Sequence, residues 1–328
     1  MPKLFVAPPG REMTAKESDF MTNLKKRLIE ERGVTESSAV KYMQMLFTLN
    51  DKQPFKNLAW AKKYDALEEK ISSYAKNTQY LFYNALNSAL SLFADKPTYR
   101  PISNHWKQKV ADSKEERSQE NPHEKSEAQA ANWMEWEQVL KKKSELKSET
   151  SSFGSLKTLN PAQYEALLKC VVLCLYTELP PRRNQDYEAM VVVKKMPKDA
   201  PTDRNYYVTS SNQFIFNRYK TARTYGQATE DVPEPLAEAI KVYLKFHPLA
   251  KSKEPHGFKF LVKQDGTPLN GVNGITRILN KVFGKRVGSS MLRHSYLTSK
   301  YGGVLEEMKK DSEAMAHSPA VQRDYVKE

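Results

Sequence analysis

The stretch that decides the fold is residues 160–187, NPAQYEALLKCVVLCLYTELPPRRNQDY. It opens with an asparagine, a proline in the first turn and a glutamine at the third helical position, which predicts a capped helix start. The helix that follows is apolar nearly all round, so we expect it to be a central buried helix. Two prolines should end it directly before the arginines. A domain should therefore be built around this helix.

Three strand-like stretches follow the buried helix. They are AMVVVKK (189–195), NYYVTSS (205–211) and NQFIFNRY (212–219), separated by turn residues, and they predict a small antiparallel sheet. Helical patterns then run to the end of the chain in EPLAEAIKVYLKF, GVNGITRILNKVFG, SSMLRHSYLTSKYGG, VLEEMKKDSEAMAH and AVQRDYVK. Residues 156–328 should therefore form an α+β domain with more helix than sheet.

The whole chain has 328 residues, which is long for one typical domain and suggests two domains. Residues 15–110 show only helical patterns and predict an all-α bundle of four or five short helices. Residues 1–14 should be a flexible arm, and residues 111–155 a charged linker with one amphipathic helix. Trp133 and Trp136 share a face of that helix, so we expect it to pack on a domain rather than stack on a base.

The composition favours a polyanionic partner. The chain has 52 Lys plus Arg against 39 Asp plus Glu, a net charge of +13 and a pI near 9.4. Nucleic acid is the usual partner of such a chain, and a basic solvated surface is the alternative. No apolar run approaches the roughly 20 residues that span a bilayer, and no secretory signal is visible. We expect an intracellular protein that does not enter membranes.

Two cysteines, Cys170 and Cys174, lie four residues apart in the apolar run CVVLCLY. A zinc site would need more ligands, and no histidine is near enough in sequence to supply them. Free cysteine is commonly buried, so we expect two small buried side chains. The sequence predicts no metal site and no small-molecule cofactor.

Two stretches place cations beside turns. In PPRRNQD, Arg183 stands three residues before Asp186, whose carboxylate could fix the guanidinium and leave its fork free for a phosphate oxygen. In FNRYKTARTYG, a strand runs into a turn at Lys220, which would place this lysine on a hairpin tip. The structural alternatives are a surface ion pair and a solvated loop lysine.

A third stretch, GSSMLRHSYLTSKYGG, predicts a helix with Ser289 or Ser290 as its N-cap and with Arg293 and His294 in its first turns. An arginine near a helix N-terminus opposes the helix dipole. A bound anion would resolve this conflict, so the helix start is a candidate phosphate site.

Taken in chain order, five residues resemble the catalytic set of the tyrosine recombinases, the lambda-integrase-like enzymes of DNA strand exchange: Arg183, Lys220, Arg293, His317 and Tyr325. RRNQD matches the family's R-x-x-E/D motif, YKTARTYG its hairpin lysine, MLRHSY its second arginine and AHS its GH-like pair. PPRRNQDY and the KT…YG hairpin are also similar to integrases of virophages and Crypton-like mobile elements.

The resemblance implies an arrangement and a partner. Residues 15–110 would be a core DNA-binding domain, and residues 156–328 the catalytic domain of a C-shaped clamp around double-stranded DNA. Four copies would assemble in a synapse. Such an enzyme would act wherever the DNA is, in a host nucleus or a viral replication compartment, and would integrate a viral or mobile-element genome.

The resemblance also implies roles. Tyr325 would attack a phosphodiester, form a 3′-phosphotyrosyl link and release a 5′-hydroxyl, without metal or ATP. Arg183 and Arg293 would hold the non-bridging oxygens. Lys220 would give a proton to the leaving oxygen. His317 would bond a phosphate oxygen or hold the tyrosine helix.

Some positions leave alternatives open. Ser290 stands where the family usually has His or Lys, and His294, Lys220 or water would have to cover that role. Arg182 is an alternative to Arg183, which we prefer because only it gives the R-x-x-D spacing.

Other readings of the chain remain. The alternative for the tail is an ordinary helix, with Tyr325 and Val321 covering an apolar face and His317 capping the preceding helix. Among functions, the alternatives are a DNA-relaxing enzyme like a type IB topoisomerase, a catalytically inactive DNA-binding relative, and a basic scaffold or RNA-binding protein.

Overall fold

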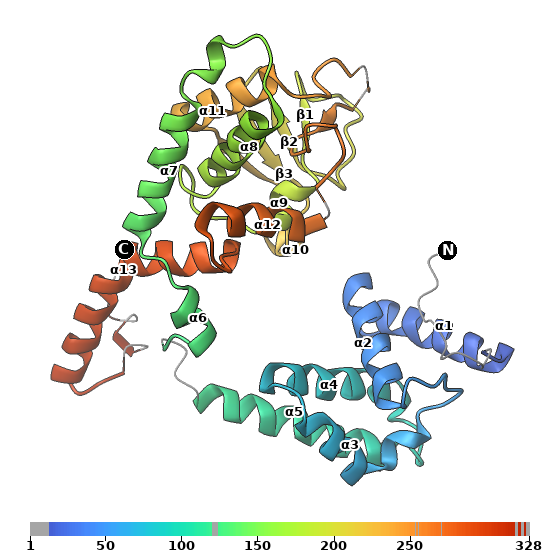
Figure 1. The fold of residues 1–328 in the computed structure, drawn as a ribbon. Coiled ribbons are helices and arrows are strands. Elements are labelled where there is room, and N and C mark those ends of the chain that lie inside the picture. Colours follow the sequence, from blue (N-terminus) through green and yellow to red (C-terminus); the bar gives the residue numbers. More distant parts are fainter. Residues whose placement is uncertain are drawn as a thin grey trace. The chain divides into compact units, whose positions relative to one another are not determined.

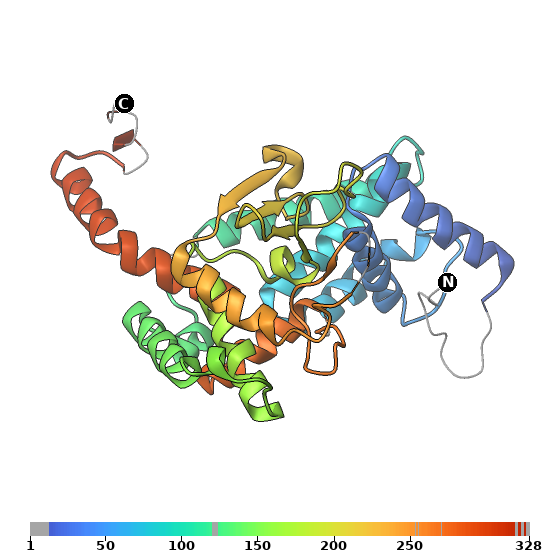
Figure 2. The ribbon, with the colours of Figure 1, turned by 90° about the horizontal axis from the view of Figure 1, so that it is seen from above.

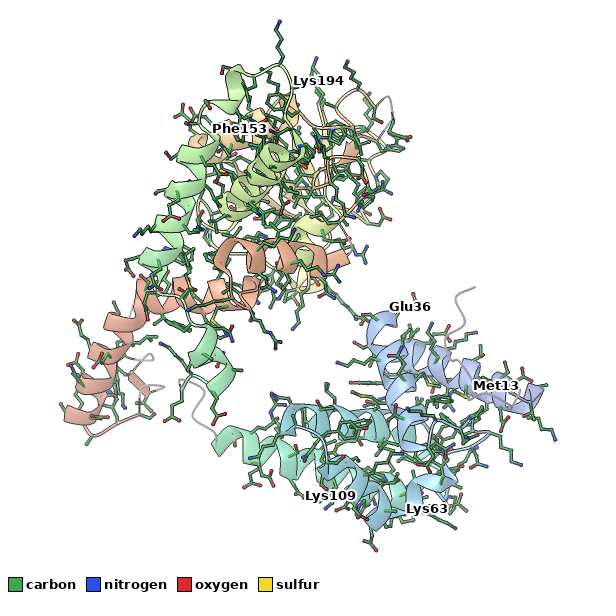
Figure 3. All side chains as sticks on the ribbon, in the orientation of Figure 1. Met13, Glu36, Lys63, Lys109, Phe153 and Lys194 are labelled. Carbon is green, nitrogen blue, oxygen red and sulfur yellow. The ribbon has the colours of Figure 1, made fainter. Side chains whose placement is uncertain are left out.

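The chain divides into two units, Met1–Glu124 and Lys125–Glu328, and each has its own hydrophobic core. The computed structural model (Figure 1) describes residues 13–119, 124–252, 254, 256–269, 271–318, 321–322 and 325. Most of the arm expected at residues 1–14 lies outside the described residues. Figure 3 shows the side chains that fill the interior of each unit.

Helices are the regular elements among the described residues of the first unit. They are α1 (Ala15–Glu30), α2 (Glu36–Leu49), α3 (Tyr64–Ser72), α4 (Lys76–Leu90) and α5 (Arg100–Gln119), with 3₁₀ turns η1 (Ala59–Lys62) and η2 (Ser91–Phe93). Thr35 caps α2, because its hydroxyl accepts a hydrogen bond from the Ser38 N–H at 3.3 Å. Trp106 is fully buried and donates to the Ala61 carbonyl at 2.9 Å. The helical pattern extends past residue 110, since α5 continues to Gln119.

The segment expected to be a linker, residues 111–155, is divided between the units. Its second half forms α6 (Glu127–Asn132), α7 (Trp136–Thr150) and the 3₁₀ turn η3 (Phe153–Ser155) of the second unit. Val139 and Leu146 of α7 are buried in the core of that unit, and Trp133 and Trp136 pack against it. The amphipathic helix therefore packs on a domain, as expected, but it begins at Trp136; Trp133 lies before it, so the two tryptophans do not share a face of one helix.

Helix α8 (Pro161–Leu175) is the buried centre of the second unit. Its predicted capping box is present: Asn160 and Gln163 exchange side-chain to backbone hydrogen bonds of 2.9 and 3.0 Å. Ten of its residues are buried, among them the free cysteines Cys170 and Cys174. The prediction of a central apolar helix is confirmed.

The sheet is mixed rather than antiparallel. Its order is β4-β3-β2-β1-β5, with β1 (Val191–Val193), β2 (Tyr206–Val208), β3 (Gln213–Phe216), β4 (Ala228–Asp231) and β5 (Phe258–Lys259). Strands β1 and β2 pair in parallel, and the other pairs are antiparallel. The segment 194–205 returns the chain to the start of the sheet, and a crossover of that length permits a parallel neighbour.

The two faces of the sheet are buried differently. Val192, Tyr207 and Phe214 belong to the core that surrounds α8. Val191 and Val193 point to the other face, where residues of the crossover cover them. The sheet is thus enclosed on both sides, which is where parallel pairs are found.

The remaining helices of the second unit are α9 (Asn184–Glu188), α10 (Ala222–Tyr225), α11 (Glu234–Lys245), α12 (Gly271–Phe283) and α13 (Ser289–Ala314). Helix α13 is continuous through Gly302 and Gly303, where two separate helices were expected. Glycine in a helix costs only about 1 kcal/mol and does not by itself break it. The second half of α13 extends beyond the body of its unit (Figure 2) and exposes Val304 and Leu305. Within the described residues, no helix has the length and apolar character of a membrane span.

His247, directly after α11, is a buried histidine held in its neutral form. Its Nε2 donates to the Phe260 carbonyl at 3.0 Å, and its Nδ1 accepts from the Leu249 N–H at 3.1 Å. Burial lowers the pKa of His247 from 6.5 to about 4. A proton on Nδ1 would also remove the hydrogen bond from Leu249.

This histidine predicts a loss of stability in acid. Between pH 6.5 and about 4 the unfolded chain binds a proton that the folded chain does not, so the free energy of unfolding falls as the pH is lowered through this window. The total loss should be roughly 3 kcal/mol. Urea unfolding across the window measures it. His247→Gln keeps a donor but cannot titrate, and its curve should be flatter; equal slopes would contradict the assignment.

Candidate active site

A pocket of about 400 Å³ opens at the start of α9 and gathers cations from separate parts of the sequence. Its walls come from the end of α8, from α9, from the β3–β4 hairpin and from α13. The lining residues are Leu179, Pro180, Pro181, Arg182, Arg183, Asp186, Tyr219, Thr221, Tyr225, Ala228, Glu230 and Arg293. Three guanidinium groups thus face two carboxylates in one hollow.

Arg183 is the N-cap residue of α9, and its backbone is extended. The next residue, Asn184, is buried and fixes this helix start. It accepts a hydrogen bond from the Tyr176 hydroxyl at 2.6 Å and donates to the Thr276 hydroxyl at 2.8 Å. Because Tyr176 follows α8 and Thr276 lies on α12, the position of Arg183 is set by two helices.

Asp186 pairs with Arg182 and not with Arg183. The Arg182 Nε lies 3.1 Å from an Asp186 carboxylate oxygen, and its guanidinium lies 3.8 Å from the centre of the Phe216 ring. A second carboxylate, that of Glu230, lies 3.7 Å from an Nη atom of Arg182. Arg183 is half-buried and has no ion pair among the described residues. The expected R-x-x-D contact is therefore replaced by one from the neighbouring arginine, which leaves Arg183 open.

The carboxyl group of Asp186 is buried. Burial raises the pKa of its carboxyl, and the charge of Arg182, its hydrogen bond and the charge of Arg183 oppose that rise. One of its oxygens, Oδ1, has no hydrogen bond among the described residues. The carboxylate therefore depends on Arg182 for its compensation.

Arg293 reaches the pocket from the second turn of α13. The N-cap of this helix is Gly288, so neither Ser289 nor Ser290 takes the expected cap position; both lie within the first turn. The Arg293 Nε is buried without an acceptor among the described residues. Burial, followed by the positive charge of Arg183, lowers the pKa of Arg293. Two like charges thus face each other, and an anion between them would relieve the repulsion.

Lys220 lies on the predicted hairpin. Strands β3 and β4 pair antiparallel, and Lys220 is exposed in the loop between them. Its neighbours Tyr219 and Thr221 line the arginine pocket, whereas its own side chain does not. The Tyr219 hydroxyl donates to the Gly226 carbonyl at 2.8 Å and closes the loop. The lysine is therefore held beside the pocket by a fixed turn.

Four further predicted residues lie outside the pocket lining. Ser290 and His294 are exposed on the first turns of α13. The rings of His317 and Tyr325 contact each other edge to face with centroids 5.8 Å apart, and Tyr325 is exposed. Parts of the final segment, including residues 319–320 and 323–324, lie outside the described residues. The structure thus groups the predicted residues into an arginine pocket and a histidine–tyrosine pair.

Sequence reasoning did not single out Tyr225 or Asn205. Tyr225 lines the pocket and is strongly exposed. Asn205 is buried, and its Nδ2 donates a hydrogen bond to the carbonyl of Asp186 at 2.7 Å. The TYG turn could have indicated the tyrosine, but a lone asparagine before a strand carries no such signal.

Comparisons with known protein families, with curated proteins and with solved structures found no match to this chain. Among the described residues, no three His, Cys, Asp or Glu side chains gather as possible metal ligands.

The two adjacent arginines should differ in what they do for stability. Arg182→Ala leaves the buried Asp186 without its partner and should lower the free energy of unfolding by about 2 to 3 kcal/mol. Arg183→Ala should change it by no more than about 0.5 kcal/mol, since removing this cation also relieves repulsion with Arg293. Urea unfolding of both variants makes the comparison. A similar loss in both would mean that Arg183 has a structural partner.

Proposed function

We propose that this chain cleaves and rejoins DNA strands through a 3′-phosphotyrosyl intermediate, as a site-specific recombinase or integrase of a viral or mobile element. The observation that carries the proposal is the meeting of Arg183 and Arg293 in one pocket, where neither forms an ion pair among the described residues and the charge of Arg183 lowers the pKa of Arg293. Two guanidinium forks suit the non-bridging oxygens of a single phosphodiester. The basic chain supports double-stranded DNA as the partner.

In this proposal the arginines stabilise the charge that develops on the phosphorus oxygens. Tyr325 gives its hydroxyl proton to solvent water and attacks the phosphorus, and the bond to the 5′ oxygen breaks as Lys220 donates a proton to that oxygen. The phosphotyrosyl link conserves the bond, so rejoining needs no ATP. Loss of either arginine should cost about 3 kcal/mol of transition-state stabilisation, or roughly a hundredfold in rate. His317, in ring contact with Tyr325, supports the tyrosine's orientation.

Tyr325 does not line the pocket, so the chemistry requires the final segment to reach an arginine pocket, in its own chain or in a second copy. Helix α13 exposes Leu297, Tyr301, Val304 and Leu305, an apolar set that an interface would cover. We therefore propose a homo-oligomer, with four copies in the working synapse. We also propose that the helical first unit binds the same duplex, as the other half of a C-shaped clamp, wherever in the cell that DNA lies.

Covalent trapping tests the nucleophile. Nicked duplexes of pooled sequence are incubated with the protein and run on a denaturing gel, where wild type should give a shifted, protease-sensitive band. Tyr325→Phe should give none. Tyr225→Phe is the matched control, because Tyr225 is equally exposed, at 75% against 72%, and lines the arginine pocket. If the band survives in Tyr325→Phe and disappears in Tyr225→Phe, the nucleophile is Tyr225.

Further arms of the same assay separate the alternatives. A mixture of Arg293→Ala and Tyr325→Phe should regain the band only if the tyrosine enters the pocket of a second copy. Products that require two DNA sites indicate a recombinase, whereas relaxation of a one-site circle indicates a topoisomerase-like enzyme. If the wild type binds DNA but gives no covalent band, and the Ser290→His variant does give one, the chain is a catalytically inactive relative.

A further inference from the structure

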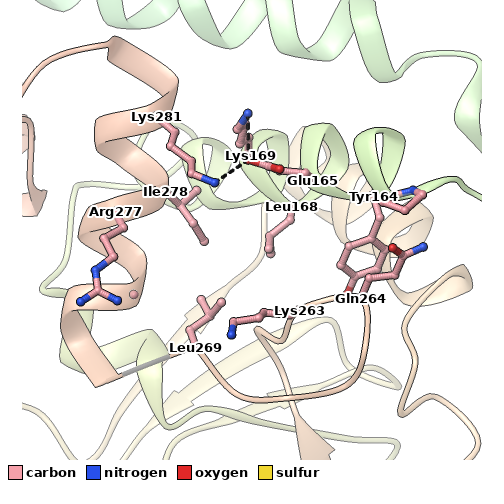
Figure 4. Close-up of a pocket in the computed structure, with 12 residues that line it drawn as sticks. Tyr164, Glu165, Leu168, Lys169, Lys263, Gln264, Leu269, Arg277, Ile278 and Lys281 are labelled. Atoms are coloured by element: carbon pink, nitrogen blue, oxygen red, sulfur yellow. Dashed lines mark hydrogen bonds and ion pairs between the residues drawn. The ribbon is translucent and has the colours of Figure 1, made fainter.

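A second cavity, of about 410 Å³, lies between α8, α12 and the turn at residues 263–269 (Figure 4). None of the residues that line it lines the arginine pocket. Its lining residues are Pro161, Tyr164, Glu165, Leu168, Lys169, Lys263, Gln264, Leu269, Gly274, Arg277, Ile278 and Lys281. The proposed cleavage chemistry has no use for this cavity.

The floor of the cavity is apolar and closely built. Leu168 of α8, Leu269 of the turn and Ile278 of α12 supply it (Figure 4). Gly274 permits this arrangement, because a Cβ atom at this position would lie 2.7 Å from the Leu269 Cβ. The start of α12 can therefore approach the turn closely enough to form one side of the hollow. A floor of this kind binds an apolar group.

The rim of the cavity is cationic. Lys169 and Lys281 share Glu165, at 3.2 and 2.9 Å, and Figure 4 shows both ion pairs. Lys263 and Arg277 are exposed and have no ion pair within the described part of the chain. A ligand that inserts an apolar group would thus meet two exposed cations at the entrance.

A neighbouring hollow of about 350 Å³ extends this site across three helices. It shares Glu165, Lys169 and Lys281 with the cavity, and Lys142 of α7 adds a further cation. The two hollows are lined by five cations, Lys142, Lys169, Lys263, Arg277 and Lys281, and by two carboxylates, Glu149 and Glu165; Lys142 is also paired with Glu145 at 2.9 Å. We call these two hollows the α7–α8–α12 groove.

We propose that the α7–α8–α12 groove binds an acidic amphipathic segment of a partner protein. A large apolar side chain of the segment fills the cavity over Leu168 and Ile278, and its carboxylates pair with Lys263 and Arg277. A single small anion would leave the second hollow unused. A DNA backbone is polar and a duplex is convex, so neither explains an enclosed apolar floor. An acidic helix with apolar residues at i, i+3 and i+7 meets both requirements.

A designed peptide tests the groove on the full chain. The probe is a fluorescein-labelled glutamate-rich peptide with leucines at i, i+3 and i+7, and its partner peptide has serines in place of the leucines. Fluorescence anisotropy should show the leucine peptide binding about tenfold more tightly. Lys263→Glu combined with Arg277→Glu should weaken it by about tenfold. The matched control, Lys198→Glu with Lys241→Glu, reverses two exposed cations outside the groove and should change the affinity by less than about twofold.

The outcomes separate the groove from general charge attraction. All four substituted lysine and arginine side chains are exposed, so thermal unfolding should show wild-type stability in both double variants. The proposal would be overturned if the leucine and serine peptides bound equally well, or if neither peptide bound. Equal losses in the groove and control variants would also overturn it. If duplex DNA displaces the peptide and the groove variants lose DNA affinity to the same extent, the groove is a DNA contact. None of these results depends on whether the chain cleaves DNA.

Discussion

The candidate site depends on one buried amide, the side chain of Asn205. Its Nδ2 donates to the carbonyls of Asp186 and Arg218 at 2.7 and 2.9 Å, and its Oδ1 accepts from the N–H groups of Asn217 and Arg218 at 2.9 and 2.7 Å. Every hydrogen-bonding group of the amide is used. One side chain directly before β2 therefore joins α9, whose N-cap is Arg183, to the base of the hairpin that carries Lys220. Because Asn205 is only 2% exposed, any loss of these bonds would leave backbone groups buried and unpaired.

A second amide completes the frame. Asn184 connects the start of α9 to Tyr176 on one side and to Thr276 of α12 on the other. Two buried, hydrogen-bonded side chains, Asn205 and Asn184, thus hold the backbone around Arg183. Fixed donors around an open cavity are the arrangement that stabilises developing charge without reorganising during the reaction. The same α12 also forms one wall of the α7–α8–α12 groove, on residues other than Thr276.

The parts of this structure that local patterns determine could be predicted from the sequence. The capped start of α8, its burial and the hairpin at Lys220 each rest on neighbours within a few residues. The parallel pairing of β1 with β2 could not be predicted in this way, because it depends on the path of a crossover that has no periodic signal. The continuity of α13 through Gly302 and Gly303 was also not predicted, because glycine weakens a helix without ending it.

The carboxylate of Asp186 shows why sequence spacing alone indicated the wrong arginine as its partner. An R-x-x-D pattern brings two side chains together when both residues are helical, as i and i+3 are. Arg183 is instead the N-cap, with φ −79° and ψ 149°, so the helical neighbour rule does not apply to it. Arg182 takes the carboxylate and lies over Phe216. This exchange matters for function, since a paired Arg183 would have been neutralised by its own helix. Arg182 forms the ion pair with Asp186, and the charge of Arg183 lowers the pKa of Arg293, so an incoming anion would relieve the repulsion between these two arginines.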